Sequence, residues 1–291
     1  MELNSQPIHT PPRDAASVIL LRDATGGLEV FLLERAGQSD VMGGAHVFPG
    51  GKVDAQDAEI DTERLLDAGA DQLHALLREP ELPATQALAL HVAAIREVFE
   101  ECGVLLAQRA STQQVAQAAS LLREGHAFDE ALALLGLRLD TASILPWSRW
   151  ITPKLPSMMR KRFDTRFFVA RMPAGQTAVH DMRETSASLW IAPREALQRQ
   201  HEGRLTLAPP QIMSIAHLAR FASVDAVLAE ARRQTPALIE PHSFDEDGAR
   251  HHCYPGDPAH PVSVRAMPGP TRLRYAQGRF EPLDGFDAFF A

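Results

Sequence analysis

The first part of the chain carries two short runs of apolar residues that predict β-strands. The runs cover residues 15–22 and 28–35, and the turn-forming Asp-Ala-Thr-Gly-Gly between them predicts a β-hairpin. A glycine-rich segment follows and ends in the turn Pro49-Gly50-Gly51. The pattern therefore predicts a piece of sheet that leads into a glycine turn.

After this turn the pattern changes to that of a long amphipathic helix. Residues 52–84 are polar and irregular, with one short helix expected at about 62–77. From residue 85 to about 108, apolar side chains recur at steps of three and four, which predicts a helix with one buried face. Gly103 is suited to end the main part of this helix in a left-handed conformation.

The rest of the sequence predicts further strands and helices. One or two helices are expected at 111–137, and later helices begin with proline, which favours a helix N-terminus. Strands are expected at 144–153, 165–172 and 187–192, helices from 193 and 208, and tail strands at 261–267 and 271–280. This order predicts an α/β fold of the α+β kind, with helices packed on a mixed β-sheet.

Composition narrows the class of protein. The chain is 45% hydrophobic and 23% charged, as globular proteins are, and its net charge of -8 disfavours nucleic acid and membrane surfaces as partners. It has two cysteines, in no CxxC pair, and no apolar run approaches the ~18 residues of a membrane helix. The first residues lack the pattern of a secretory signal. We therefore expect a cytoplasmic protein.

The predicted long helix carries an unusual group of acids. Glu97, Glu100 and Glu101 are spaced so that they share one helix face, where like charges repel. A hard divalent cation such as Mg2+ or Mn2+ would reverse that repulsion, since it prefers oxygen ligands. Arg96 lies beside them and could hold one carboxylate in place. The spacing alone favours the simpler interpretation, a charged face in contact with water.

The residues around these acids resemble a known family. Residues 96–104 fit the pattern R-E-U-x-E-E-x-G-U, where U is aliphatic, and Phe-Pro-Gly-Gly stands upstream at 48–51. Together they resemble the signature of the Nudix hydrolases. The resemblance implies the Nudix fold, a mixed sheet sandwiched between helices. It also implies that Glu97, Glu100 and Glu101 hold the catalytic metal against a diphosphate, with Arg96 as part of the catalytic set.

The signature is split by an insertion. If Gly51 and Arg96 belong to the usual box G-x5-E-x7-R-E, then residues 52–95 separate them, about 31 more than usual. The loop glutamate has no assured counterpart, since position 57 is Asp57 and Glu59 lies close by. The split resembles a Nudix subgroup that includes a mammalian coenzyme A diphosphatase.

The resemblance suggests an organisation of the whole chain. We expect a lead at 1–14, a Nudix domain at 15–235 with its insert at about 54–84, and a C-terminal extension of unknown role at 236–291. The insert either caps the pocket or forms a contact in a homodimer.

Candidate substrate-binding residues come from two segments. CoA-cleaving Nudix enzymes carry an upstream motif, and Arg35, Ala36, Gly44 and the Phe-Pro-Gly-Gly match it, whereas Leu33 and Asp40 depart. Arg35 would meet a substrate phosphate, or is a surface residue at a strand end. The dense basic cluster is a phosphate clamp or a solvated face, and it comprises Lys154, Arg160, Lys161, Arg162 and Arg166. Arg35, Gly50, Gly51, Arg162 and Arg166 are the predicted substrate-binding residues.

The function implied by the resemblance is metal-dependent hydrolysis of a diphosphate in a small-molecule nucleoside diphosphate derivative. The first candidate substrate is CoA or acyl-CoA, cleaved to 3',5'-ADP and (acyl-)4'-phosphopantetheine. The alternatives are another substrate, such as ADP-ribose or a dinucleotide, and a non-catalytic Nudix module that senses a ligand. The general base is one of the helix glutamates or a loop acid such as Glu184.

Other chemistry-bearing residues favour plainer interpretations. Met158 and Met159 either line an apolar channel for an acyl arm or fill the core. The group His251, His252, Cys253 and His260 matches no common zinc spacing, and we expect surface histidines in a loop. Cys102 lies on the apolar stripe of the long helix and is expected to be buried.

Overall fold

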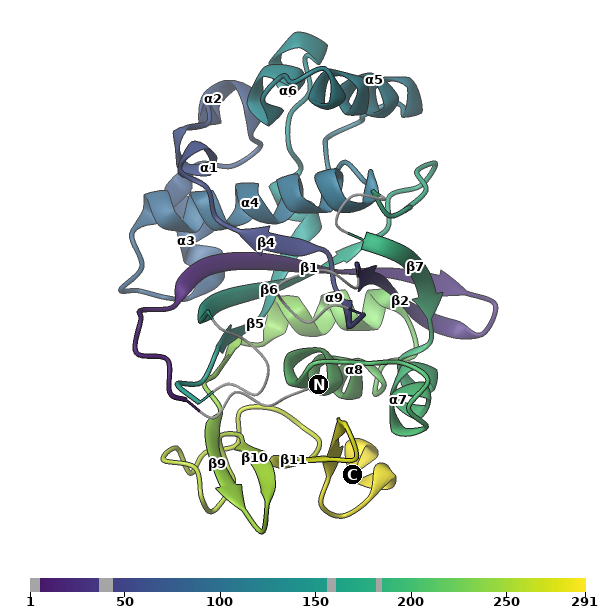
Figure 1. Ribbon diagram of the computed structural model, residues 1–291. Helices are drawn as coiled ribbons and strands as arrows, with labels where there is room; N and C mark the ends of the chain where they lie inside the picture. Colours follow the sequence, from purple (N-terminus) through teal and green to yellow (C-terminus); the bar gives the residue numbers. More distant parts are fainter. Residues whose placement is uncertain (1–5, 37–43, 156–160, 182–184) are drawn as a thin grey trace.

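A mixed β-sheet with helices on both faces forms the centre of the computed structural model (Figure 1). The structure describes residues 6–36, 44–155, 161–181 and 185–291. The sheet has eight strands, and the first pair, β1 (Arg13–Ala24) and β2 (Gly27–Arg35), forms the predicted hairpin. The other strands are β3 (His46–Val47), β4 (Gly50–Lys52), β5 (Ile144–Ile151), β6 (Phe163–Arg171), β7 (Thr185–Ile191) and β8 (Ala237–Ile239). The expected fold class is confirmed.

The central strand β1 shows why the sheet is covered on both sides. Successive side chains of a strand point to opposite faces. Val18 and Leu20 pack in one hydrophobic cluster, whereas Ile19 and Leu21 pack in the other, and all four are fully buried. β1 lies parallel to β6 and antiparallel to β2 and β4, so the sheet is mixed.

One face of the sheet is covered by the long helix α4 and the helices around it. α4 runs from Ala84 to Cys102, and Gly103 follows with φ of 70°, donating its N–H to the Phe99 carbonyl. The left-handed end at Gly103 is as predicted, but the helix ends at 102 rather than near 108. The other helices of this layer are α1 (Ala55–Glu59), α2 (Thr62–Leu65), α3 (Ala70–Leu77), α5 (Thr112–Arg123) and α6 (Phe128–Leu135).

The insert forms three short helices where the sequence predicted one. The expected helix at 62–77 is interrupted because Leu66 leaves the helical conformation and forms a β-bridge with Leu139. The Leu139 N–H donates to the Leu65 carbonyl at 2.7 Å. This pairing ties the insert to the segment that precedes β5.

The opposite face carries α7 (Pro193–His201), α8 (Pro209–Leu218) and α9 (Val224–Arg233), followed by a second, four-stranded sheet. Its strands are β9 (His242–Glu246), β10 (Ala249–Cys253), β11 (Arg272–Ala276) and β12 (Arg279–Pro282). Tyr254, Leu273 and Phe280 of this C-terminal region share one hydrophobic cluster with Trp150 and Met213. The extension is thus packed against the main sheet layer.

Two predictions about the C-terminal region are wrong. The strand expected at 261–267 is an irregular loop, because Val262 and Val264, whose alternation predicted it, are exposed and bury no side chain that would stabilise a strand. Of the histidines expected in a surface loop, His251 and His252 lie on β10 and are buried, whereas His260 lies in a loop as predicted. Both cysteines are free and buried, so the burial of Cys102 is confirmed.

A network of buried ion pairs joins the insert to the sheet. Arg166 on β6 is 3% exposed and forms ion pairs with Asp14 and Asp164 of the sheet and with Glu79, which follows α3. Arg149 on β5 pairs with the same Glu79 at 2.7 Å and with Asp164 at 2.6 Å. The alternating charges compensate one another where water is excluded.

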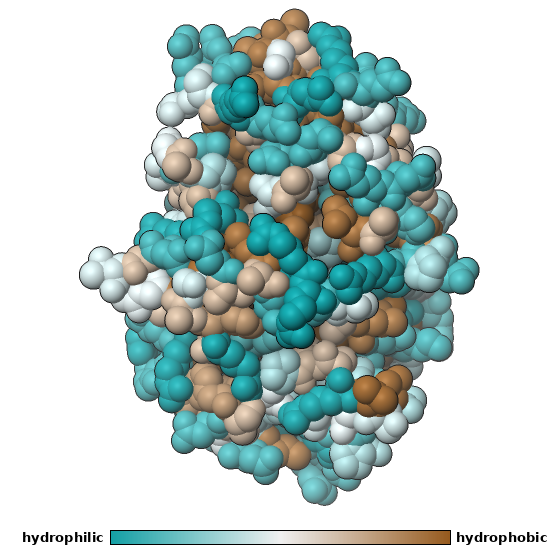
Figure 2. Space-filling model, turned by 180° about the vertical axis from the view of Figure 1, so that it is seen from behind, coloured by the Kyte–Doolittle hydropathy of each residue, from teal (hydrophilic) through white to brown (hydrophobic). Residues whose placement is uncertain are grey.

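The outer surface mixes hydrophilic and hydrophobic residues. Seen from behind, the molecule is mostly hydrophilic, with small and separate hydrophobic patches (Figure 2). Among the residues that the structure describes, no helix combines the length and apolar character needed to cross a membrane.

The network predicts a structural role for Arg166. Arg166→Met should lower the free energy of unfolding by about 3 kcal/mol, because it removes a buried cation and leaves Asp14, Glu79 and Asp164 with Arg149 alone to balance their charges. Denaturant unfolding measures this change. Glu195→Gln, which removes one partner of an exposed pair with Arg199, is the control and should change it by less than about 1 kcal/mol. Equal effects of the two substitutions would contradict the role.

Candidate active site

The three predicted glutamates lie on the C-terminal half of α4, next to the glycine turn. Glu101 is 7% exposed, the Glu97 side chain is 14% exposed, and the Glu100 side chain is 41% exposed. The apolar side chains on the other faces of the helix pack in the core, where Ile95 and Val98 are fully buried. The apolar stripe therefore fixes the helix so that its acidic strip is partly removed from water.

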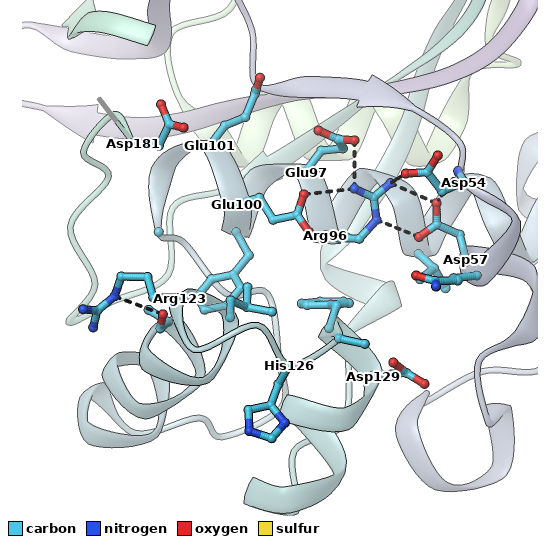
Figure 3. Close-up of a pocket in the computed structure, with 18 of the residues that line it drawn as sticks. Asp54, Asp57, Arg96, Glu97, Glu100, Glu101, Arg123, His126, Asp129 and Asp181 are labelled. Atoms are coloured by element: carbon cyan, nitrogen blue, oxygen red, sulfur yellow. Dashed lines mark hydrogen bonds and ion pairs between the residues drawn. The ribbon is translucent and has the colours of Figure 1, made fainter. Parts of the chain in front are cut away.

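Arg96 occupies the centre of this acidic strip. Its Nε donates to Asp57 Oδ1 at 2.8 Å and its Nη2 donates to Asp57 Oδ2 at 3.0 Å, a bidentate pair (Figure 3). Its Nη1 donates to Glu97 at 2.9 Å and to Glu100 at 3.1 Å. Nη2 also donates to the Lys52 carbonyl at 3.2 Å. One guanidinium thus holds three carboxylates and the backbone of β4 together.

Of the two acids near position 57, Asp57 is the one that contacts Arg96. Its side chain is 2% exposed, whereas Glu59, two residues later on α1, is exposed. Asp57 is the third residue of α1, and its Oδ2 also accepts the Asp54 N–H at 2.8 Å. Asp57 precedes most of the insert, so the acid in contact with Arg96 stays close to Gly51 in the sequence.

The glycine turn fits against the glutamates so closely that side chains are excluded. The Gly50 N–H donates to Glu101 Oε2 at 2.8 Å. A Cβ added to Gly51 would lie 2.5 Å from the Glu97 carboxylate, and one added to Gly50 would clash with the backbone of Ala16 and Ser17. Both glycines are required for close approach, which explains the turn found in the sequence.

Burial changes the proton affinity of the acidic strip. The pKa of Glu97 and that of Glu100 are raised, chiefly because burial disfavours the ionised form, while Arg96 partly opposes the shift. Burial alone would lower the pKa of Arg96, but its bonds with Asp57 and the charges of Glu97 and Glu100 raise it overall. Arg96 therefore remains a cation, and the two glutamates carry charge at a cost.

The donor chemistry of the strip fits a hard divalent cation. Carboxylate oxygens are the ligands such ions prefer, and a cation would stabilise the ionised forms that burial disfavours. Within the described parts of the chain, no three Asp, Glu, His or Cys side chains are placed closely enough to hold an ion. Glu97 and Glu100 point to Arg96 instead (Figure 3). Metal binding would thus require these carboxylates to turn away from the guanidinium.

Two cavities meet at the acidic strip. Their volumes are about 620 and about 630 Å³, within the range of small-molecule sites. The first lies between α4, α1 and the α5–α6 pair, and the second lies between the glycine turn, β6 and the start of α8. The residues that line both are Asp54, Arg96, Glu97, Glu100 and Glu101.

The predicted phosphate-binding residues divide between the cavity and the core. Arg35, Gly50 and Gly51 line the second cavity together with the glutamates. Arg162 and Arg166 do not line it; Arg162 donates to the Thr152 carbonyl and to Glu240. The alternation of β6 explains this, because the residues that face the cavity are Phe163, Thr165 and Phe167. Arg162 and Arg166 were predicted to contact substrate, and this prediction is wrong because both form contacts within the fold.

Sequence reasoning overlooked some residues of the site. Lys161 belongs to the predicted basic cluster but was not singled out, although it lines the second cavity, as does Arg13. Lys161 is two residues before Phe163, and the alternation of strand side chains could have shown that it faces the same side as Phe163 and Thr165. Asp181, which accepts hydrogen bonds from the Thr185 N–H and hydroxyl, lines the first cavity. Glu184, Asp40, Arg160, Met158 and Met159 lie outside the described residues.

This sheet between helices, with residues 96–104 at the C-terminal end of α4 beside a Pro-Gly-Gly turn, defines a Nudix hydrolase. A solved Nudix hydrolase from Alicyclobacillus acidocaldarius is similar in structure, with a TM-score of 0.59 and 28% sequence identity. The match covers 76% of this chain and 97% of that one.

The comparisons also identify the branch of the family. The family model described as the NUDT19 Nudix domain matches residues 11–218, and the chain belongs to this family. Acyl-coenzyme A diphosphatase NUDT19 of Gallus gallus is 30% identical, over 83% of this chain and 73% of that protein. The protein of the same name from Homo sapiens is 31% identical, over 68% of this chain and 62% of that protein.

The contact between Asp57 and Arg96 leads to a prediction that separates the two acids of α1. Asp57→Asn should lower both the free energy of unfolding, by about 3 kcal/mol, and the hydrolytic kcat, because Arg96 loses its bidentate partner and no longer positions Glu97 and Glu100. Glu59→Gln is the matched control and should change neither quantity. Unfolding curves and steady-state kinetics test both variants, and a larger loss of activity in Glu59→Gln would reverse the assignment.

Proposed function

We propose that the protein hydrolyses the diphosphate linkage of CoA or an acyl-CoA to 3',5'-ADP and 4'-phosphopantetheine or its acylated form. The relatives named acyl-coenzyme A diphosphatase support this substrate class. The observation that carries the proposal is that Arg35, from the upstream motif typical of CoA-cleaving members, lines the same cavity as the glutamates of α4. Residues far apart in sequence are thereby available to one substrate.

The proposed chemistry uses the acidic strip and the glycine turn. Glu97, Glu100 and Glu101 would hold Mg2+ or Mn2+, which when bound supplies positive charge for the phosphoryl oxygens and a water of lowered pKa. A carboxylate accepts the proton of the attacking water while the bond between phosphorus and the bridging oxygen breaks. A helix glutamate suits this task because all three line the cavities at the place where the diphosphate would lie. Glu184 remains the alternative base.

Arg96 and the backbone N–H of Gly50 position carboxylates and take no part in proton transfer. The guanidinium fixes Glu97 and Glu100, and the Gly50 N–H fixes Glu101. When Glu97 and Glu100 turn from the guanidinium to a metal ion, the bidentate pair with Asp57 keeps Arg96 in place beside them. Arg35 would neutralise substrate phosphate charge on the side of the second cavity.

A substrate panel tests the proposed function. We expect cleavage of CoA and acyl-CoA in the presence of Mg2+ or Mn2+, release of 3',5'-ADP, and no turnover with chelator. Rapid cleavage of ADP-ribose or a dinucleotide without cleavage of CoA would show that the proposed substrate class is wrong. Binding of these compounds with no cleavage of any would instead indicate a sensor.

Substitutions of the glutamates test the catalytic assignment. Glu101→Gln should lower kcat by at least about 100-fold, because it removes an oxygen ligand and the charge that faces the phosphoryl group. Glu63→Gln, an exposed acid on α2, is the control and should retain full activity. Circular dichroism confirms that the variants are folded, and full activity of Glu101→Gln would refute the metal-binding role.

The raised pKa of Glu97 predicts how stability depends on pH and metal. Because the folded-state pKa lies above the unfolded one, ionisation of Glu97 costs stability as pH rises through the interval between the two values. Glu97→Gln should therefore raise the Tm of the chelator-treated protein at neutral pH, with a smaller effect in acid. Mn2+ should raise the Tm of the original protein more than that of the variant. Equal shifts on adding Mn2+ would contradict metal binding by Glu97.

A further inference from the structure

The acidic strip lies at a junction, and this position constrains any substrate that is cleaved there. Asp54, Arg96, Glu97, Glu100 and Glu101 line both cavities, so a linkage held at these acids has one cavity on each side. A diphosphate in the middle of a long molecule would extend one half into each. The two cavities then decide which half lies where.

The charges of the two cavities differ in sign. Beyond the shared residues, the second cavity is lined by four basic side chains and, among its described lining residues, by no carboxylate. These side chains are Arg13, Arg35, Lys52 and Lys161. The first cavity adds three carboxylates and one arginine, namely Asp57, Asp181, Asp129 and Arg123. A half that carries an extra phosphate is therefore favoured in the second cavity and disfavoured in the first.

The first cavity instead offers an apolar wall. The wall is built by Ile60, which directly follows α1 of the insert, by α4, by the α5–α6 pair and by the segment before β7. Its other apolar members include Phe99, Leu122, Phe128 and Val179. In Figure 3 the labelled polar residues Arg123, His126 and Asp129 lie on the α5–α6 side, away from Glu97 and Glu101. A cavity of about 620 Å³ with such a wall suits a flexible, uncharged chain.

Val179 is the wall residue best placed to report on this cavity. Its side chain is 54% exposed although it is apolar, so a larger residue there displaces cavity space rather than core. Its N–H donates to the Cys102 carbonyl at 3.1 Å, which ties this position to the C-terminal end of the catalytic helix. The side chain is thus held beside the acids by a backbone contact that a substitution leaves intact.

We infer that the first cavity, between α1 of the split-box insert and the α5–α6 pair, binds the acyl-pantetheine arm of the substrate. The 3'-phosphorylated nucleotide then lies in the second cavity. This assignment rests on the proposed function and adds its orientation and the residues that select the acyl chain. It gives the insert a direct role, since Ile60, directly after its first helix, builds part of the wall.

Specificity ratios test the assignment. For the full-length protein, kcat/KM is measured with CoA, 3'-dephospho-CoA and dodecanoyl-CoA. Val179→Trp should lower the ratio of dodecanoyl-CoA to CoA by about tenfold or more, because it fills the apolar cavity, and should leave the ratio of CoA to 3'-dephospho-CoA unchanged. Lys161→Gln should lower the second ratio and leave the first unchanged. Val179→Asp, which places a charge in the wall, should act in the same direction as Val179→Trp.

The matched controls are Val264→Trp and Val264→Asp, at a valine that is 75% exposed and lines neither cavity. Both controls should leave both ratios unchanged. Equal loss on CoA and dodecanoyl-CoA in the Val179 variants would overturn the assignment while the proposed function stands. A change in 3'-phosphate preference in Val179→Trp would reverse the orientation and also overturn it. Failure of the original protein to cleave any CoA compound would overturn the proposed function itself, and the assignment with it.

Discussion

The buried guanidinium of Arg96 is the interaction on which the site depends. It contacts a carboxylate from the insert, two carboxylates from its own helix and a carbonyl of β4, all within 3.2 Å. Without this cation, acids gathered on one strip of α4 would repel one another in a region of low dielectric. The acids can be close to a phosphate site because a fixed positive charge already lies among them. Its contact with the Lys52 carbonyl joins the part of the chain before the insert to the helix that follows the insert.

The sheet organises the rest of the molecule around this contact. Alternation along β1 and β6 sends one set of side chains to the α4 layer and the other to the layer of α7–α9 and the C-terminal sheet. The cavities open where the glycine turn meets α4. The acidic strip and most of the apolar wall belong to the α4 layer, whereas the basic residues Arg13, Arg35 and Lys52 belong to strands of the sheet. His252 and Pro241 of the C-terminal extension also line the second cavity, so the extension contributes to its wall.

Much of the fold and half of the site followed from local sequence patterns. The hairpin, the long helix and its end at Gly103 were predictable because periodicity and glycine act locally. The glutamates and the glycine turn were recognisable because their spacing follows from one helix and one turn. The assignments of Arg162 and Arg166 failed because charge clustering in sequence says nothing about which face of a strand each residue occupies. The buried ion pairs with Glu79 and the strands of the C-terminal sheet depend on distant partners, which a local pattern cannot reveal.

The position of Asp57 ahead of most of the insert has a topological consequence. The Asp57–Arg96 pair brings the two ends of the intervening segment together, so this segment forms a closed excursion from the catalytic centre. The entropy lost in closing such a loop grows only with the logarithm of its length, at about 0.6 kcal/mol for each doubling. A long excursion therefore costs little more than a short one, and of its helices α2 and α3 carry none of the groups that Arg96 holds. The chain thus separates a part that must keep its geometry from a part that can vary with the molecule to be recognised.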